Sequence, residues 1–367
     1  MEFSEFQVPT RVVAGRGLST SIDIELQREG LTRGLLLTDA GVRPLADRVR
    51  RAAGSRVVGV YDAITPNSSV EQVEEAARLA RELEADFLLA VGGGSVLDTA
   101  KAAALVFTEG GRLLDHQGVN VLARPLLPVA AVPTTAGTGS EVSIYAVVRD
   151  ENTGTKVSFI SEHLAPALAV LDPVLTLGLP PGLTAATGLD ALTHALEAFL
   201  SVKAGPLSDA LALAAARTVL RELPRAVVDG SNLEARWRML TASCLAGMAF
   251  SWAMVGCVHA MAHACGGLRE VPHGLANAIL LPHGLEYNRP AAGDRFGILG
   301  EWMGADPVEA VRSLAERIAL PTRLREVGVE EADLAALAEL AMLDGSIYAN
   351  PREATAEEIE AVLRAAL

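Results

Sequence analysis

The sequence predicts an α/β dinucleotide-binding domain, with a parallel sheet covered by helices on both faces, followed by an all-helical domain. Three observations predict this. The chain has 367 residues, more than one hydrophobic core usually serves. Short apolar runs alternate with helical patterns in the first half, and from about Leu175 only helical patterns follow. We therefore expect a nucleotide-binding domain at residues 1–174 and a helical, metal-binding catalytic domain at residues 175–367.

Short apolar runs in the first half predict buried strands at Gly34–Asp39, Arg56–Asp62, Phe87–Val91 and Pro128–Val132. Helical patterns between them lie at Arg43–Ala53, Val70–Leu83 and Ser95–Val106. The second of these helices follows Asn67-Ser68-Ser69, whose side chains suit an N-cap, and acidic residues in its first turns suit the helix dipole. Strands separated by helices of about ten to fifteen residues are typical of a parallel sheet.

Long Ala- and Leu-rich helical patterns make up the second half, at Leu183–Phe199, Pro206–Leu223, Leu233–Ala249 and Val255–Ala264, with shorter ones up to Leu367. Between Met239 and Leu268 there is no Asp, Glu, Lys or Arg, and this stretch is long enough to span a bilayer. It carries histidines, glycines and small polar residues, however, and no second such stretch exists. We expect a buried helix at the centre of a soluble domain, with no membrane involved.

Composition narrows the class of protein further. The net charge of −14 argues against nucleic acids and anionic membranes as partners, because both favour a basic surface. The three cysteines form no CxxC pair, which predicts buried reduced thiols rather than a disulfide framework. The N-terminal stretch lacks a basic segment followed by an apolar one, so we expect a cytoplasmic protein.

Two loops of small residues follow predicted strands and indicate a phosphate-bearing ligand. Gly92-Gly93-Gly94-Ser95 leads directly from a strand into a helix, where backbone N–H groups can approach a pyrophosphate. The loop from Pro133 to Ser140 offers the hydroxyls of Thr134, Thr135 and Thr138. Neither loop matches the GxGxxG fingerprint at the first strand. Both nevertheless lie at strand carboxyl ends, where open α/β sheets bind ligands.

Asp39 ends the first predicted strand. A carboxylate at this place accepts hydrogen bonds from a ribose diol and repels a 2′-phosphate. Asp39 therefore favours NAD over NADP, and the alternative is that it serves only a turn.

Five of the seven histidines cluster in the most apolar part of the helical half, together with one aspartate. Asp190 and His194 are four residues apart and share a helix face, and His259 and His263 repeat this spacing. A carboxylate with several imidazoles is a ligand set for Fe²⁺ or Zn²⁺. By spacing alone, His263 and His283 are as eligible to be ligands as His259 and His273.

Four segments resemble, in order and spacing, the signature segments of the iron-containing (group III) alcohol dehydrogenases: GGGSVLDTAK, PTTAGTGSEVS, GLDALTHALEAFLS and HAMAHACGGLREVPHGLANAILLPH. The resemblance extends over essentially the whole chain. It implies a dehydroquinate-synthase-like architecture, a homodimer, and the reversible, NAD-linked oxidation of a small alcohol to an aldehyde or ketone. A bound divalent metal would act as a Lewis acid on the alcohol oxygen.

The same resemblance implies roles for individual residues. It places the metal on Asp190, His194, His259 and His273, and it leaves His263 beside the nicotinamide for proton relay or substrate orientation. The implied cofactor contacts are Asp39, Asn67, Gly93, Gly94, Ser95, Thr134, Thr135, Thr138 and Lys156, to which we add Asp98 in the motif helix. Tyr145 departs from the family pattern, in which a smaller polar residue is frequent near the cofactor.

Other functions on the same scaffold are a polyol dehydrogenase resembling glycerol dehydrogenase and a metal-free enzyme resembling maleylacetate reductase. The intact Asp/His set weighs against the second. A lyase resembling dehydroquinate synthase needs a pocket rich in Lys and Arg, and basic residues are few between Asp190 and Glu270. A non-catalytic metal- or nucleotide-binding protein would not need both a nicotinamide loop and a metal cluster.

Overall fold

The computed structural model describes residues 5–367, which form two compact units. The first, here called the α/β unit, holds Val8–Thr135 and Gly139–Leu177. The second, the helical unit, holds Gly178–Leu367, the described residues before Val8, and Ala136–Thr138. Three residues of the second small-residue loop therefore belong to the helical unit.

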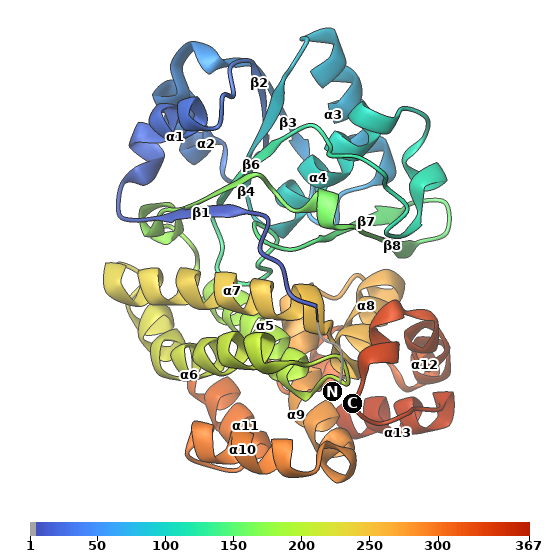
Figure 1. Cartoon of the computed structure of the whole chain (residues 1–367). Coiled ribbons are helices and arrows are strands. Elements are labelled where there is room, and N and C mark those ends of the chain that lie inside the picture. The colour runs from blue at the N-terminus through green and yellow to red at the C-terminus, as the bar shows by residue number, and fades with distance from the viewer. Residues whose placement is uncertain (1–4) are drawn as a thin grey trace. The chain divides into compact units, whose positions relative to one another are not determined.

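A six-stranded sheet forms the centre of the α/β unit, with the order β1-β9-β6-β4-β2-β3. Every neighbouring pair in it is parallel, as the fold class predicted (Figure 1). The four predicted strands are present, three of them with slightly shifted ends, whereas β1 and β9 were not predicted. The strands are β1 (Arg11–Ala14), β2 (Gly34–Asp39), β3 (Val57–Ile64), β4 (Phe87–Gly92), β6 (Val129–Pro133) and β9 (Leu168–Leu171).

Helices cover both faces of this sheet, because successive strand residues point to opposite sides. Leu36 of β2 packs in one apolar cluster with α1 and α2, whereas Leu35 and Leu37 pack in another with α3 and α4. A capping box formed by Ser69 and Gln72 starts α3, within the region where N-cap chemistry was expected. The helices are α1 (Ile22–Arg28), α2 (Arg43–Ala53), α3 (Val70–Glu82) and α4 (Gly94–Glu109).

A smaller sheet of three strands, which the sequence did not reveal, completes the α/β unit. Its order is β5-β8-β7, with β5 at Gly118–Val119, β7 at Tyr145–Asp150 and β8 at Thr155–Ile160. The β7–β8 pair is antiparallel, and residues along β7 alternate between buried and half-buried. This alternation is the period-2 pattern of a strand with one covered face.

The helical unit is built around α5, whose residues from Leu189 to Leu200 are all buried. Close approach between helices depends on small residues: a Cβ at Gly188 of α5 would lie 2.3 Å from Leu223 Cδ1 of α6. The helices are α5 (Pro181–Leu200), α6 (Pro206–Val228), α7 (Leu233–Ala253), α8 (Cys257–Arg269), α9 (His273–Ala292), α10 (Asp294–Met303), α11 (Pro307–Arg317), α12 (Leu334–Leu343) and α13 (Ala356–Ala366).

The charge-free stretch from Met239 to Leu268 is not one helix. It is divided between α7 and α8, which are bent by 102° at the break that separates them. Among the described residues, no single helix has the length and apolar composition of a membrane span. Only α7 and α8 taken together have that length and composition. Most residues of both helices are buried within the protein.

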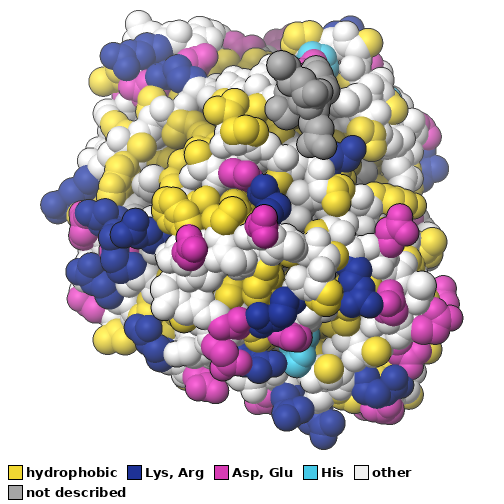
Figure 2. Space-filling view, turned by 60° about the horizontal axis from the view of Figure 1, so that its bottom comes forward, with side chains coloured by type: hydrophobic (Ala, Val, Ile, Leu, Met, Phe, Trp, Pro, Cys, Tyr) yellow, Lys and Arg dark blue, Asp and Glu magenta, His cyan; other side chains and the backbone are white. Residues whose placement is uncertain are grey.

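Charges on the face of the helical unit in Figure 2 are mixed, with acidic and basic side chains interspersed. Ion pairs in the helical unit also join residues of opposite charge: Arg289 pairs with Glu286 at 3.0 Å and with Asp306 at 2.7 Å. Arg312 pairs with Glu309 at 3.2 Å. Acidic groups therefore lie beside these arginines. In the chain as a whole acidic residues outnumber basic ones, which gives the net charge of −14.

Candidate metal centre and cofactor loops

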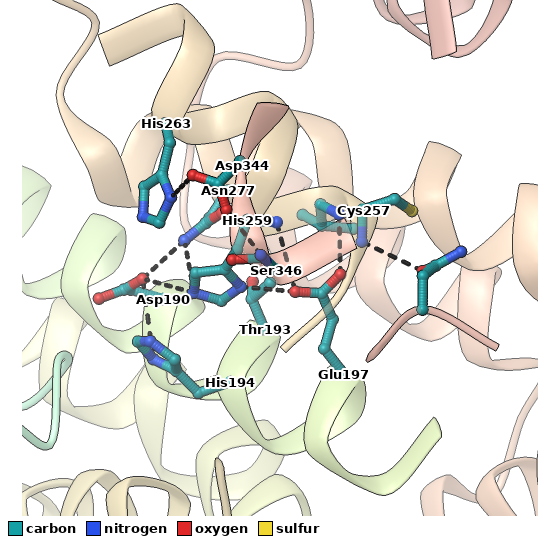
Figure 3. Close-up of polar contacts among 12 residues, drawn as sticks. Asp190, Thr193, His194, Glu197, Cys257, His259, His263, Asn277, Asp344 and Ser346 are labelled. Carbon is teal, nitrogen blue, oxygen red and sulfur yellow. Dashed lines mark hydrogen bonds and ion pairs between the residues drawn. The ribbon is translucent and has the colours of Figure 1, made fainter. Parts of the chain in front are cut away.

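Three histidines of the helical unit surround one carboxylate oxygen. Helix α5 carries Asp190 and His194 one turn apart, α8 carries His259 in its first turn, and His273 begins α9. Oδ1 of Asp190 lies 3.8 Å from His194 Nδ1, 3.9 Å from His259 Nε2 and 3.5 Å from His273 Nε2 (Figure 3). Residues 83 positions apart in the chain therefore meet at one point.

Within the described part of the chain, one group of three side chains has the geometry to hold a metal ion. It consists of Asp190, His259 and His273, whose ligand atoms all lie within 4.8 Å of one another. His194 is not in this group, but its ring lies 4.3 Å from that of His259 and stacks on Phe250 at 4.4 Å between centroids. Three of the four expected ligands thus converge, and the fourth lies beside them.

His194 shows that these residues fit a divalent cation. Its Nδ1 is buried and makes no hydrogen bond with any residue that the structure describes. Burial lowers the pKa of His194 to about 4, more than the nearby Asp190 carboxylate can offset. The imidazole is therefore neutral at pH 7, with a lone pair to donate. A buried polar atom without a partner is costly in an apolar environment, and coordination of a metal would relieve that cost.

Asn277 is a further member of the cluster that the sequence did not identify. It lies on α9 one turn after His273, and its Nδ2 donates to Asp190 Oδ1 at 2.7 Å. The same nitrogen lies 3.3 Å from His259 Nε2 and 3.2 Å from His273 Nε2. The available signal was the spacing of four residues after His273, which places both side chains on one helix face.

Two carboxylates hold histidines of α8, and the sequence missed both. Glu197 Oε2 lies 2.5 Å from Nδ1 of His259, and Asp344 Oδ2 lies 2.8 Å from Nδ1 of His263. Glu197 follows Asp190 by seven residues on the same face of α5, so helical spacing could have revealed it. Asp344 is 81 residues from its histidine, at the end of α12, and no local pattern connects them.

His263 lies next to the ligand cluster. Its ring stacks on that of His273 at 5.1 Å between centroids. Burial acts to raise the pKa of Asp344, but the charge and hydrogen bond of His263, with hydrogen bonds from Ser346, hold it well below its usual range. Asp344 is therefore ionised at pH 7 and accepts the Nδ1 proton of His263.

His283 lies apart from this cluster, although spacing alone could not exclude it as a ligand. It faces a separate pocket of about 220 Å³ that is also lined by Arg312 and Arg323. Burial, reinforced by the two guanidinium charges, lowers the pKa of His283 to about 4. The structure thus distinguishes His273 from His283, although each follows a proline and precedes a glycine.

In the α/β unit, the two small-residue loops leave adjacent strands and contact each other. Thr134 N donates to Gly92 O at 2.9 Å, and a Cβ on Gly93 would lie 3.4 Å from the Thr135 side chain. Asn67 N donates to Ser95 Oγ at 3.2 Å. Six of the expected cofactor contacts therefore lie around the N-terminus of α4: Asn67, Gly93, Gly94, Ser95, Thr134 and Thr135.

The remaining expected cofactor contacts lie elsewhere. Thr138 belongs to the helical unit, and Lys156 lies on β8, paired in register with Arg149. Oδ1 of Asp39 accepts hydrogen bonds from Gly41 N and Val42 N at 2.8 and 3.1 Å, so this carboxylate forms a turn at the end of β2. Tyr145 begins β7, where burial raises its pKa.

Asp98 and Lys101 bind the second loop to α4. The carboxylate of Asp98 accepts two hydrogen bonds: Val147 N donates to Oδ2 at 3.1 Å, and Ser140 Oγ donates to Oδ1. The ammonium of Lys101 is completely buried and donates to Ser140 O at 3.0 Å and to Ser143 Oγ at 3.1 Å. In this structure Asp98 is thus engaged with the protein itself.

Replacing Lys101 with methionine should lower the free energy of unfolding by about 3 kcal/mol, because Asp98 and buried carbonyl oxygens would lose their charged partner. Urea denaturation of the wild type and the variant measures the difference. Lys203, which lies between α5 and α6 in an exposed position, provides the control. Equal losses in the Lys101 and Lys203 variants would show that the buried ammonium does not stabilise the loop.

Comparisons with known proteins match both units. Residues 9–173 match the family model described as iron-containing alcohol dehydrogenase, and residues 184–367 match that of the C-terminal part of the Fe-containing alcohol dehydrogenase family. The 1,3-propanediol dehydrogenase of Klebsiella pneumoniae is 39% identical over 381 aligned positions, which cover 99% of this chain and 98% of that protein. The NAD-dependent methanol dehydrogenase of Bacillus methanolicus is 36% identical over 380 positions, covering 99% of this chain and 100% of that protein.

A solved structure of a 1,3-propanediol oxidoreductase superimposes on the chain with a TM-score of 0.96 at 38% sequence identity. The superposition covers 100% of both chains. Sequence and fold therefore point to one group of enzymes.

Proposed function

Since the chain belongs to the iron-containing alcohol dehydrogenase family, we propose that it uses NAD and one divalent metal ion to interconvert an alcohol and its aldehyde or ketone. Alcohol dehydrogenase activity follows from membership of this family. The observation that carries the metal requirement is the cluster of Asp190 with three imidazoles in the buried part of the helical unit.

Asp190, His194, His259 and His273 would hold the ion, and their oxygen and nitrogen atoms suit Fe²⁺ and Zn²⁺ alike. A divalent ion bound there supplies Lewis-acid polarisation of the substrate oxygen. The chain itself helps to orient one of these ligands, because Phe250 packs against the His194 ring. Rigid positioning of this kind lowers the reorganisation needed during the reaction.

We assign His263 the task of transferring the alcohol proton toward solvent. Because its Nδ1 donates to Asp344, Nε2 is the nitrogen available for proton exchange. The side chain is 15% exposed, so it connects the buried cluster with the surface of the helical unit.

We assign dinucleotide binding to the loops around the N-terminus of α4. Free backbone N–H groups at a helix N-terminus bind phosphate, and the glycines after β4 allow a close approach. The relative from Bacillus methanolicus is named NAD-dependent, which supports NAD as the cofactor here. Asp39 supports NAD over NADP, since its Oδ1 serves the turn while the carboxylate charge would repel a 2′-phosphate.

Replacing Asp39 with alanine should raise the ratio of kcat/KM for NADP to that for NAD by about tenfold, which corresponds to one hydrogen bond to a charged group. Initial rates with both cofactors measure this ratio. The Asp39→Asn variant is the control, because it keeps an acceptor for Gly41 N and Val42 N but removes the charge. If neither variant changes the ratio and only the alanine variant loses stability, Asp39 serves the turn alone.

We propose further that the substrate is a small alcohol or diol, that the enzyme is a homodimer, and that it acts in the cytoplasm without nucleic acid or membrane partners. The 1,3-propanediol dehydrogenase among its relatives supports a small substrate. Light scattering tests the dimer.

The decisive experiment combines metal analysis of protein purified without chelator with NADH formation from methanol, 1-propanol, 1,3-propanediol and glycerol. We expect about one metal ion per chain, activity that a strong chelator abolishes, and recovery upon addition of Fe²⁺ or Zn²⁺. Undiminished activity after chelation would instead favour a metal-free enzyme resembling maleylacetate reductase, and activity confined to glycerol would favour a polyol dehydrogenase.

A further inference from the structure

The break between α7 and α8 brings the first turn of α8 against a buried glutamate of α5. Met254 has a positive φ of 64° at this break, and Gly256 immediately precedes α8. A Cβ at Gly256 would lie 2.7 Å from Asn350 Oδ1 and 3.0 Å from Glu197 Oε1. Only a residue without a side chain therefore leaves room for these two acceptors.

Glu197 and Asn350 bind the N–H groups that begin α8. Val258 N donates to Glu197 Oε1 at 2.7 Å, His259 N donates to Glu197 Oε2 at 3.3 Å, and Cys257 N donates to Asn350 Oδ1 at 3.1 Å. The first N–H groups of a helix have no partner within the helix, and its dipole favours an anion there. Glu197 is 4% exposed and has no Lys or Arg partner in the described part of the chain, so the helix terminus is its main source of stabilisation.

The same carboxylate holds the ring of His259. Oε2 of Glu197 lies 2.5 Å from His259 Nδ1 (Figure 3). Because both oxygens of Glu197 accept backbone N–H groups, the side chain acts as an acceptor toward the ring as well, so the ring proton lies on Nδ1. Nε2 is then the unprotonated nitrogen, and it is the atom that faces Oδ1 of Asp190.

We propose that Glu197 is the positioning residue of the metal centre: it fixes the tautomer and orientation of His259 and thereby sets the affinity for the metal. The inference rests on the proposed function, because it needs Asp190 and the histidines to bind an ion. Helix α5 then supplies the ligands Asp190 and His194 and the residue that orients a third ligand from α8. Carboxylates that accept a proton from a metal-bound histidine have this effect in metal sites generally.

Replacement of Glu197 with glutamine tests the proposal, because the two side chains have the same shape. In either orientation of the amide, its NH₂ group faces a donor: the backbone N–H of Val258, or Nδ1 of His259. Opposite His259, the amide favours the tautomer with the proton on Nε2, the atom needed for coordination. We expect the dissociation constant for Zn²⁺, measured by competition with a chromogenic chelator, to rise about 10- to 100-fold. At saturating Zn²⁺, kcat should recover toward the wild-type value.

Glu222→Gln is the matched control. Glu222 is also a buried glutamate of the helical unit, 1% exposed, but its partners are Arg221 and Arg225 rather than a histidine. We expect this variant to lose stability and to keep wild-type affinity for Zn²⁺. Glu197→Asp, which retains the charge on a shorter side chain, serves if the glutamine variant does not fold, with an expected affinity between those of Glu197→Gln and the wild type.

Two outcomes overturn different statements. If the wild type binds Zn²⁺ and both Glu197 variants bind it with unchanged affinity, while their melting temperatures fall, Glu197 is only a helix cap and the inference is wrong. If the wild type itself binds neither Zn²⁺ nor Fe²⁺ and remains active in chelator, the metal requirement of the proposed function fails first.

Discussion

Replacing His273 with alanine is expected to remove the bound metal and to lower kcat/KM by about 1,000-fold or more. The imidazole is one of three groups whose ligand atoms lie within 4.8 Å of one another, and it begins α9. A metal that polarises a substrate oxygen contributes several kcal/mol to transition-state stabilisation, and each 1.36 kcal/mol is tenfold in rate. Metal content by elemental analysis and kcat/KM with added metal measure both effects.

His283→Ala is the matched control for this variant. Both histidines lie on α9 between a proline and a glycine, but His283 lines the pocket of Arg312 and Arg323 and lies outside the ligand group. We expect the His283 variant to keep its metal and most of its activity. Equal loss of metal in the two variants would contradict the assignment of His273 as a ligand.

Replacing His263 with alanine should lower kcat by about 100- to 10,000-fold, the usual contribution of a general acid–base group, while the metal content stays near that of the wild type. The residue stacks on His273, so small changes in metal affinity are expected, but its Nδ1 is committed to Asp344. Kinetics at saturating metal, together with elemental analysis, separate the two effects.

Asp344→Asn tests the same assignment of His263 by changing its hydrogen-bond partner. It should lower kcat by at least about tenfold, because the hydrogen bond that the imidazole donates loses its charged acceptor. If the His263 variant loses its metal as completely as the His273 variant, His263 is a ligand rather than a proton-transfer group.

Much of the α/β unit could be predicted because its signals are local. The helix Arg43–Ala53 and the strand Gly34–Asp39 have the expected ends, since apolar periodicity and turn residues define both. Strands β1 and β9 escaped prediction because each has only four residues, too few to show a period. β1 is recognisable only from its pairing with β9, and that pairing joins segments more than 150 residues apart.

The metal cluster was predictable in composition but not in membership. Helical spacing identified Asp190 with His194 on one face, and His259 with His263 on another. Which of the histidines meet at one point depends on how α5, α8 and α9 pack, and spacing within a helix carries no information on packing between helices. For the same reason Asp344, which reaches His263 from α12, had no signature in the sequence.

The assignment of Ala136–Thr138 to the helical unit has a consequence for dissecting the protein. The chain passes from one unit to the other at four positions, 7/8, 135/136, 138/139 and 177/178. Gly137 lies so close to α5 that an added Cβ would be 2.8 Å from Thr187 Cβ. Severing the polypeptide after residue 177 would leave Ala136–Thr138 on the N-terminal fragment, so we expect the C-terminal fragment not to fold as an autonomous module when it is expressed alone.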